Sequence, residues 1–195
     1  MLTIVWDVDD VLNDLMAQWF LHGWLPSHPD CLLTYRDLTG NPPHAALGVD
    51  RSEYLSSLDA FHKTDRGANL TPSAEVLGWL SREGHRFRHI ALTARPLETA
   101  PHVAHWVFHH FGAWIRCFGV VPSRTGCDIP SYDTKKAEFL AWLGRGDILI
   151  DDSPENIQQA QSIGLKTLMP RQPWNQSGLT MHDLLENLTR MADSL

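Results

Sequence analysis

The stretch TIVWDVDDVLND, residues 3–14, decides the fold, because an apolar run ends there in clustered acids. Residues 2–8 form an apolar run of the length of a buried strand. The acids are Asp7, Asp9, Asp10 and Asp14. Carboxylates this close repel one another unless a cation neutralises them. The stretch therefore predicts a strand whose carboxyl end delivers acidic side chains to one site.

The composition is that of a one-domain globular protein with a modest insertion. Its 195 residues are enough to bury a sizeable core, and 43% of them are hydrophobic. The formal net charge of −7 speaks against broad nucleic-acid or membrane binding, which needs basic patches, but not against a small phosphorylated substrate. Cys31, Cys117 and Cys127 are odd in number and lack zinc spacing. Because neither a signal peptide nor a membrane span is indicated, we expect a cytoplasmic protein.

The rest of the chain alternates segments with strand and helix patterns. We expect strands at 87–93, 117–121, 147–150 and 165–170, and helices at 12–24, 72–83, 98–112, 134–143 and 154–163. This alternation predicts a Rossmann-like three-layer α/β/α fold with a mostly parallel sheet. The pattern weakens between 26 and 71, where loops rich in Pro, Gly and Asn separate short helical pieces. We interpret this block as an insertion after the first strand and helix.

Polar residues follow three of the predicted strands and open one helix. They are Asp7 and Asp9, Thr93, Lys135 or Lys136, and Asp151 with Asp152. In open α/β sheets, ligands bind outside the carboxyl ends of the strands, so we expect these side chains to converge. Hard carboxylate oxygens suit Mg²⁺ better than zinc. In phosphoryl transfer, Asp7 would be the nucleophile and Asp9 the general acid and base. Thr93 and a lysine would hold the phosphoryl oxygens.

These segments resemble the four motifs of the haloacid dehalogenase-like (HAD) hydrolases: DVDDVL, LTAR, a lysine opening a helix, and LIDDSPEN. The resemblance covers residues 1–14 and about 72–170. It implies a magnesium-dependent phosphatase with Asp7, Asp9, Thr93 and Lys136 as catalytic residues. Lys136 is preferred because the AEFL that follows resembles the lysine-headed helix of the family, while Lys135 stays an alternative. The implied metal ligands are Asp7, Asp9 through its backbone carbonyl, and Asp152, with Asp151 beside them.

The insertion resembles the small helical cap of this family, which implies a cap at 15–71 and a core at 1–14 and 72–195. DDVLND, the spacing from Tyr35 to Gly40, and RQPWNQ at 171–176 resemble the 5′(3′)-deoxyribonucleotidase branch and its bacterial relatives. That implies a (deoxy)nucleoside 5′-monophosphate as substrate. The substrate-binding residues expected from these patterns are Thr93, Ala94, Arg95 and Trp19. The chain departs from the branch at Asp10, where the branch has Gly, and at Leu15, where it has a base-stacking aromatic. Trp19, Phe20 or Trp24 would then supply an aromatic wall.

Other interpretations stay open. The substrate could be another small phosphorylated metabolite or a polynucleotide end. The chain could instead be a phosphoacceptor module like a response-regulator receiver, although a receiver has its paired acids early and its acceptor aspartate in mid-chain. It could also be an inactive binding protein on the same fold. Arg95 either contacts substrate or fixes a loop. Asp10 and Asp14 are expected to have local structural roles, and the histidines at 102, 105 and 109 to face solvent.

Overall fold

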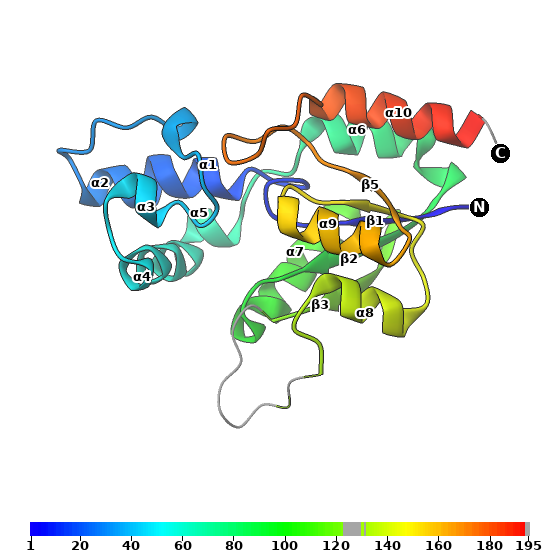
Figure 1. Cartoon of the computed structure of the whole chain (residues 1–195), viewed down its shortest axis with the longest axis horizontal. Helices are drawn as coiled ribbons and strands as arrows, with labels where there is room; N and C mark the ends of the chain where they lie inside the picture. The colour runs from blue at the N-terminus through cyan, green and yellow to red at the C-terminus, as the bar shows by residue number, and fades with distance from the viewer. Residues whose placement is uncertain (123–129, 131, 194–195) are drawn as a thin grey trace.

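The computed structural model describes residues 1–122, 130 and 132–193, and Cys127 lies outside them. Within these residues, a five-stranded parallel sheet has the strand order β3-β2-β1-β4-β5 (Figure 1). The strands are β1 (Thr3–Trp6), β2 (Arg88–Thr93), β3 (Ile115–Val120), β4 (Ile148–Ile150) and β5 (Lys166–Leu168). The predicted parallel sheet is confirmed.

Helices cover both faces of the sheet. They are α6 (Ala74–Glu83), α7 (Ala100–Phe111), α8 (Lys136–Leu143), α9 (Pro154–Ser162) and α10 (Met181–Asp193). The larger apolar core includes Val76 of α6, Val107 of α7 and Leu184 of α10. On the other face, Leu140 of α8 and Ala160 of α9 form a smaller core. The chain therefore has the three-layer α/β/α fold that its sequence predicts.

β1 is the central strand and is buried on both faces. Ile4 and Trp6 belong to the larger core and Val5 to the smaller one, because successive side chains of a strand point to opposite faces. All three are fully buried. A strand in this position brings the next residue, Asp7, to the middle of the carboxyl edge of the sheet.

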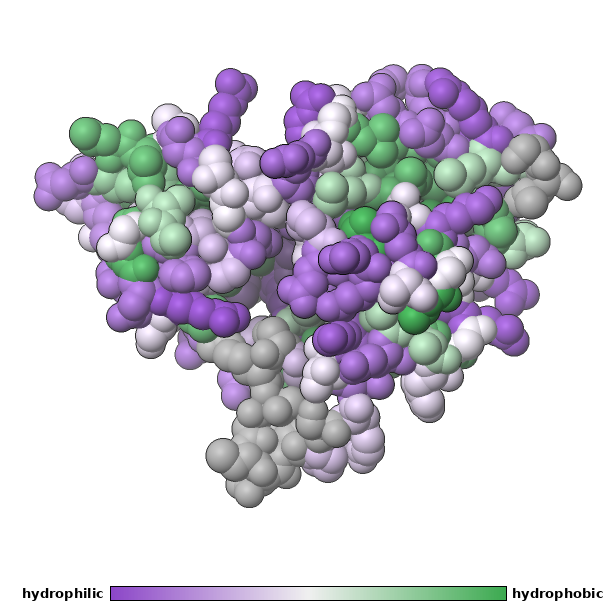
Figure 2. Space-filling model, viewed as in Figure 1, coloured by the Kyte–Doolittle hydropathy of each residue, from purple (hydrophilic) through white to green (hydrophobic). Residues whose placement is uncertain are grey.

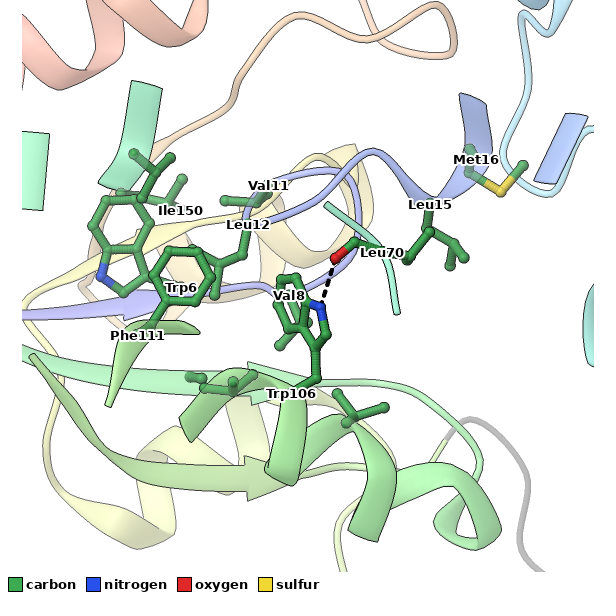
Figure 3. Close-up of a cluster of buried hydrophobic side chains, with 14 of the residues drawn as sticks. Trp6, Val8, Val11, Leu12, Leu15, Met16, Leu70, Trp106, Phe111 and Ile150 are labelled. Atoms are coloured by element: carbon green, nitrogen blue, oxygen red, sulfur yellow. Dashed lines mark hydrogen bonds between the residues drawn. The ribbon is translucent and has the colours of Figure 1, made fainter. Parts of the chain in front are cut away.

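The larger core continues past the end of β1 toward the insertion. Figure 3 shows it extending from Trp6 to Met16, which lies at its far end. Trp106 of α7 packs in this cluster, and its indole N–H donates a 2.7 Å hydrogen bond to the carbonyl of Leu70 (Figure 3). This contact fastens the returning end of the insertion to α7.

The segment predicted as a cap, residues 15–71, contains short helices to one side of the sheet (Figure 1, left). They are α1 (Leu15–Trp19), the π-helix η1 (Phe20–Trp24), α2 (Leu25–Ser27), the 3-10 helix η2 (Tyr35–Asp37), α3 (His44–Leu47), α4 (Arg51–His62) and α5 (Asp65–Ala68). α4 begins after Asp50, whose carboxylate accepts the N–H of Glu53 at 2.8 Å. The exact division between core and cap stays a prediction.

The first helix begins later than the apolar pattern predicts. The pattern predicts a helix over 12–24, whereas α1 begins at Leu15. The side-chain oxygen of Asn13 accepts the N–H groups of Leu15 at 3.0 Å and of Asp10 at 3.3 Å. These bonds hold residues 10–13 in a turn instead of a helix. Asp10 has a φ of 59°, a left-handed conformation that is uncommon for residues other than glycine.

The boundaries of the later helices differ by up to two residues from those predicted. α6 begins at Ala74 instead of Pro72, because Ser73 is its N-cap and accepts the N–H of Val76. Ser153 caps α9 in front of a proline, as predicted. The short 3-10 turns η3 (Gly84–Arg86) and η4 (Leu97–Thr99) precede β2 and α7.

The surface of α7 follows the predicted pattern. His102, His105 and His109 are exposed, opposite the apolar stripe that includes Val103 and Phe111. In the part of the chain that the structure describes, no helix is long and apolar enough to cross a membrane.

Candidate active site

Asp7 lies at the carboxyl edge of the sheet, directly after β1. Its backbone N–H donates to the carbonyl of Ile150 at 2.8 Å and so extends the ladder with β4. Its Oδ1 accepts the N–H of Val8 at 2.6 Å and lies 2.7 Å from Nζ of Lys136. The described residues donate no hydrogen bond to Oδ2 of Asp7. This second oxygen is available to a ligand.

Lys136 is the lysine beside Asp7. It is the first residue of α8, is 2% exposed, and lies 2.7 Å from Asp7 and 2.7 Å from Asp151. Lys135 is the exposed N-cap residue. Burial acts to lower the pKa of Lys136, but Asp151 and Asp7 outweigh it and raise that pKa. Lys136 therefore carries a positive charge between two carboxylates.

Asp151 follows β4 and is fully buried. Besides Lys136, its carboxylate accepts the N–H of Ser153 at 2.9 Å and the side-chain amide of Asn156 at 3.0 and 3.1 Å. These donors satisfy both of its oxygens and fix the carboxylate in one orientation. Asp151 thus acts as the anchor of Lys136.

Asp7, Asp151 and Asp152 form a buried carboxylate cluster in which one ligand oxygen from each lies within 4.8 Å of the others. Burial raises the pKa of Asp7 well above its usual range; Lys136 lowers it, and the other two carboxylates raise it again. Burial also raises the pKa of Asp152, and Asp151 adds to this. One lysine faces three carboxylates made of hard oxygen donors. The cluster therefore fits a divalent cation such as Mg²⁺, which these residues would hold.

Asp9 points its carboxylate at Arg95 instead of at this cluster. Nε and Nη2 of Arg95 donate to its two oxygens, each at 2.6 Å, and Asn13 donates to Oδ1 at 3.1 Å. Burial acts to raise the pKa of Asp9, but Arg95 outweighs it and lowers that pKa. Arg95 thus fixes the Asp9 loop, and its expected role in substrate binding stays a prediction. The implied metal contact of Asp9 is through its backbone carbonyl, so it does not need this carboxylate.

Replacing Arg95 by Met should move the titration of the Asp9 carboxylate to higher pH. The guanidinium lowers the pKa of Asp9, and once it is removed the burial that raises the pKa remains. The ¹³C carboxyl resonance of Asp9, followed by NMR against pH, measures this shift. The matched control is Arg82→Met, on the exposed surface of α6. If the titration does not move in Arg95→Met, the ion pair does not control the charge of Asp9.

Thr93 ends β2 and opens the segment TARP. Its side chain is almost fully buried, and its hydroxyl oxygen accepts the N–H of Arg95 at 3.2 Å. Thr93, Ala94 and Arg95 line the same cleft as Asp7 and Lys136. The structure thus brings residues from β1, β2 and the start of α8 to one opening.

This cleft has a volume of about 300 Å³. In Figure 2 the surface is hollowed between the part that holds the inserted helices, at left, and the part that holds the sheet. The inserted segment lines the cleft with Leu15, Met16, Arg51, Tyr54, Leu55, Leu58, Asp59 and His62. An adjoining cavity of about 390 Å³ shares His62 and Arg95 with it. Such volumes are typical of sites for small molecules.

The expected aromatic wall is not at this cleft. Trp19 and Phe20 are fully buried and Trp24 is 2% exposed. The indole of Trp19 donates to the hydroxyl of Ser57 at 3.2 Å, inside the packed inserted helices. The assignment of Trp19 to substrate binding is therefore corrected. Its large apolar ring packs in the core of the insertion instead, and Tyr54 is the aromatic residue of the insertion that lines the cleft.

Several polar contacts of the site were missed by sequence reasoning. Asn13 and Asn156 hold Asp9 and Asp151, and Trp174 donates to Asp152 at 2.7 Å. The amide at 156 could have been noticed, because it lies five residues after Asp151 on the first turn of a helix. The contact of Trp174 had no local signal.

Comparisons with known proteins identify the fold. No protein-family model and no curated protein matches this chain. A hydrolase of the haloacid dehalogenase-like family from Streptococcus pneumoniae is similar, with a TM-score of 0.66 and 13% identity over 98% of each chain. A haloacid dehalogenase-like protein of unknown function from Agrobacterium tumefaciens has a TM-score of 0.63 and 15% identity over 97% of this chain and 98% of its own. A putative beta-phosphoglucomutase from Thermotoga maritima has a TM-score of 0.55 and 13% identity over 97% of this chain and 99% of its own. The chain therefore has the fold of the HAD-superfamily hydrolases.

Proposed function

We propose that this protein is a magnesium-dependent phosphatase of small phosphomonoesters that works through a phosphoaspartate on Asp7. The observation that carries the proposal is the buried cluster of Asp7, Asp151 and Asp152 with Lys136, at the bottom of a cleft of small-molecule size. Its excess negative charge calls for a cation, and a cation next to a carboxylate nucleophile is the arrangement that phosphoryl transfer requires. Mg²⁺ held by these residues would neutralise charge on the phosphoryl oxygens.

In the first step, an oxygen of Asp7 attacks phosphorus, an O–P bond to Asp7 forms, and the bond to the leaving alcohol oxygen breaks. Lys136 and the Thr93 hydroxyl stabilise the charge on the transferring group. Asp9, a carboxylate while it is paired with Arg95, takes up a proton from solvent as substrate binds and gives it to the leaving oxygen. Because Asp9 is paired with Arg95 in the free protein, the phosphate oxygens of a substrate would compete with Asp9 for that guanidinium.

In the second step, a water molecule attacks the phosphorus of the phosphoaspartate. Asp9, now a carboxylate, takes a proton from this water, and the bond between phosphorus and Asp7 breaks to release inorganic phosphate. Asp151 holds Lys136 in place through both steps. Asp9 ends this step protonated and returns the proton to solvent when it pairs with Arg95 again, so the residues return to their starting protonation states.

We propose (deoxy)nucleoside 5′-monophosphates as the substrate class. Support comes from the resemblance of DDVLND, the segment from Tyr35 to Gly40, and RQPWNQ to the deoxyribonucleotidase branch. The net charge of −7 favours a small phosphorylated substrate over a nucleic acid. A cytoplasmic location is part of the same proposal, because intracellular nucleotides would be the substrates.

The test is a screen for phosphate release by the purified protein, with Mg²⁺ and with a chelator. The panel holds deoxy- and ribonucleoside monophosphates, sugar phosphates, other small phosphoesters and a phosphorylated oligonucleotide. We expect many equivalents of phosphate per protein from nucleoside 5′-monophosphates with Mg²⁺, and background release with the chelator, because the cluster then lacks its counter-charge.

Each other result contradicts a different part of the proposal. Turnover of other phosphoesters alone would discard the nucleotide class and keep the phosphatase. Labelling of one equivalent without turnover would favour the receiver-like module. Release that is unchanged by the chelator would discard the role of Mg²⁺.

A further inference from the structure

A loop at 171–178 closes on itself beside the carboxylate cluster. The N–H of Arg171 donates to the carbonyl of Leu179 at 2.7 Å, and the hydroxyl of Ser177 donates to the carbonyl of Met169 at 2.6 Å. The side-chain amide of Asn175 donates to the carbonyl of Pro170 at 3.0 Å. These bonds across the base of the loop fix its shape from within.

This loop makes three hydrogen bonds to the site. The indole N–H of Trp174 donates to Oδ2 of Asp152 at 2.7 Å, and Asn175 donates to the backbone carbonyl of Asp152 at 2.9 Å. The side-chain amide of Gln172 donates to the backbone carbonyl of Asp10 at 2.8 Å. The loop therefore holds both the side chain and the backbone of Asp152.

The hydrogen bond from Trp174 to Asp152 is not easily replaced by one to water. Trp174 is 8% exposed and Asp152 is 5% exposed, so water is a poor substitute partner for either group. An indole N–H only donates, and the carboxylate oxygen accepts it at a short, charge-assisted distance. The indole fixes Oδ2 of Asp152 and with it the orientation of the carboxylate that forms the cluster with Asp7 and Asp151.

The inserted segment also contacts this loop, through Tyr35. The hydroxyl of Tyr35 donates to the side-chain carbonyl of Gln172 at 3.1 Å. The Tyr35 ring also packs edge-on against Trp174, with a distance of 6.2 Å between ring centroids and an interplanar angle of 88°. The indole is thus held between a carboxylate and an aromatic ring, which restricts its rotation.

We propose that Trp174 is a positioning residue that orients the Asp152 carboxylate as a ligand of the divalent cation. The inference rests on the proposed function, because it assumes that the carboxylate cluster binds Mg²⁺. Groups that hydrogen-bond a metal ligand set its orientation, and their loss typically weakens metal binding by about 10- to 100-fold. Without the indole N–H, the Asp152 carboxylate rotates away from its cluster neighbours, which also relieves their repulsion.

The test compares two tryptophan variants by calorimetric titration of Mg²⁺ into the metal-free protein. Trp174→Phe removes the N–H and keeps most of the ring. Its matched control is Trp79→Phe. Trp79 of α6 is also buried and also makes one indole hydrogen bond, to the hydroxyl of Thr189 in α10 at 2.9 Å. We expect Trp174→Phe to weaken Mg²⁺ binding by about 10- to 100-fold and Trp79→Phe to leave it unchanged.

Three results would overturn the inference, and they separate it from the proposed function. Equal Mg²⁺ affinity in Trp174→Phe and the unchanged protein removes the positioning role and leaves the phosphatase proposal standing. An equal loss in Trp79→Phe shows a general packing effect and has the same meaning. If the unchanged protein does not bind Mg²⁺, both the inference and the proposed role of the cation fail.

A second measurement uses the unchanged protein and so does not depend on the folding of a variant. The indole ¹H–¹⁵N resonance of Trp174 should shift as Mg²⁺ is added, because its acceptor becomes a cation ligand, while the resonance of Trp79 should stay in place. A Trp174 resonance that stays in place while calorimetry shows Mg²⁺ binding would also overturn the inference.

Discussion

Asp7→Asn is expected to abolish phosphate release, with a loss on the order of 10⁴-fold or more, as for removal of a catalytic group elsewhere. An amide oxygen is a poor nucleophile and cannot form the phosphoaspartate, although it still accepts the bonds from Val8 and Lys136. The measurement is phosphate release with Mg²⁺. Asp14→Asn is the matched control from the same stretch, because Asp14 is exposed and, among the residues that the structure describes, its carboxylate bonds only to nearby Gln18. Retained turnover in Asp7→Asn would contradict the mechanism.

The same variant gives a stability readout in metal-free protein. The pKa of Asp7 is raised in the folded state above its usual value of 3.8. Its contribution to stability is therefore present below that pH and is lost as the pH rises through the raised pKa. Asn at this position does not titrate. The unfolding free energy of the variant minus that of the unchanged protein should therefore increase as the pH rises from about 4 toward neutrality. A constant difference would mean that burial does not raise the pKa of Asp7.

Lys136→Met is expected to lower both stability and activity. Removing one partner of a buried ion pair leaves uncompensated charge and costs about 3–5 kcal/mol, and here Asp7 and Asp151 lose the same cation. Urea unfolding of the metal-free protein at neutral pH measures the loss. Phosphate release should fall by about 10²- to 10³-fold, because a donor to the phosphoryl oxygens is missing.

Lys135→Met is the control for this variant, because it removes the neighbouring, exposed lysine and should change neither property. The stability difference between Lys136→Met and the unchanged protein should also depend on pH. When Asp7 is protonated at low pH, Lys136 has less negative charge to neutralise, so the stability difference should shrink there. Equal losses in the two lysine variants would show that Lys136 has no special role.

The ends of the strands are what local sequence patterns predict well. Asp7, Thr93 and Asp151 each end an apolar strand segment, and the topology of a parallel sheet then brings them to one edge. The choice between Lys135 and Lys136 needed coordinates, because a shift of one residue in the start of a helix moves a side chain by about 100° around its axis.

Side-chain partners in loops were not predictable in the same way. The pairing of Arg95 with Asp9 depends on how two separate loops turn, and no periodicity fixes either turn. Trp174 reaches Asp152 from a loop 22 residues further along the chain. The late start of α1 depends on one side chain, Asn13, competing for backbone N–H groups.

α10 is absent from the helices predicted from the sequence, although its apolar spacing is present there. Leu184, Leu185 and Leu188 have the spacing of an amphipathic helix, and all three are buried in the core that α6 shares. The helix lies beyond the segments that carry chemistry and contributes to the fold rather than to the cleft.

The turn at Asp10 has a mechanical consequence. Holding a residue other than glycine in the left-handed conformation costs roughly 1–2 kcal/mol. In this chain, Oδ1 of Asp10 accepts the N–H of Met16 at 3.0 Å and its carbonyl accepts the amide of Gln172. One residue thus ties together the strand end, the first inserted helix and the C-terminal loop. These bonds restrain the strand end, the first inserted helix and the C-terminal loop relative to one another, so the carboxylates beside Asp10 keep their places.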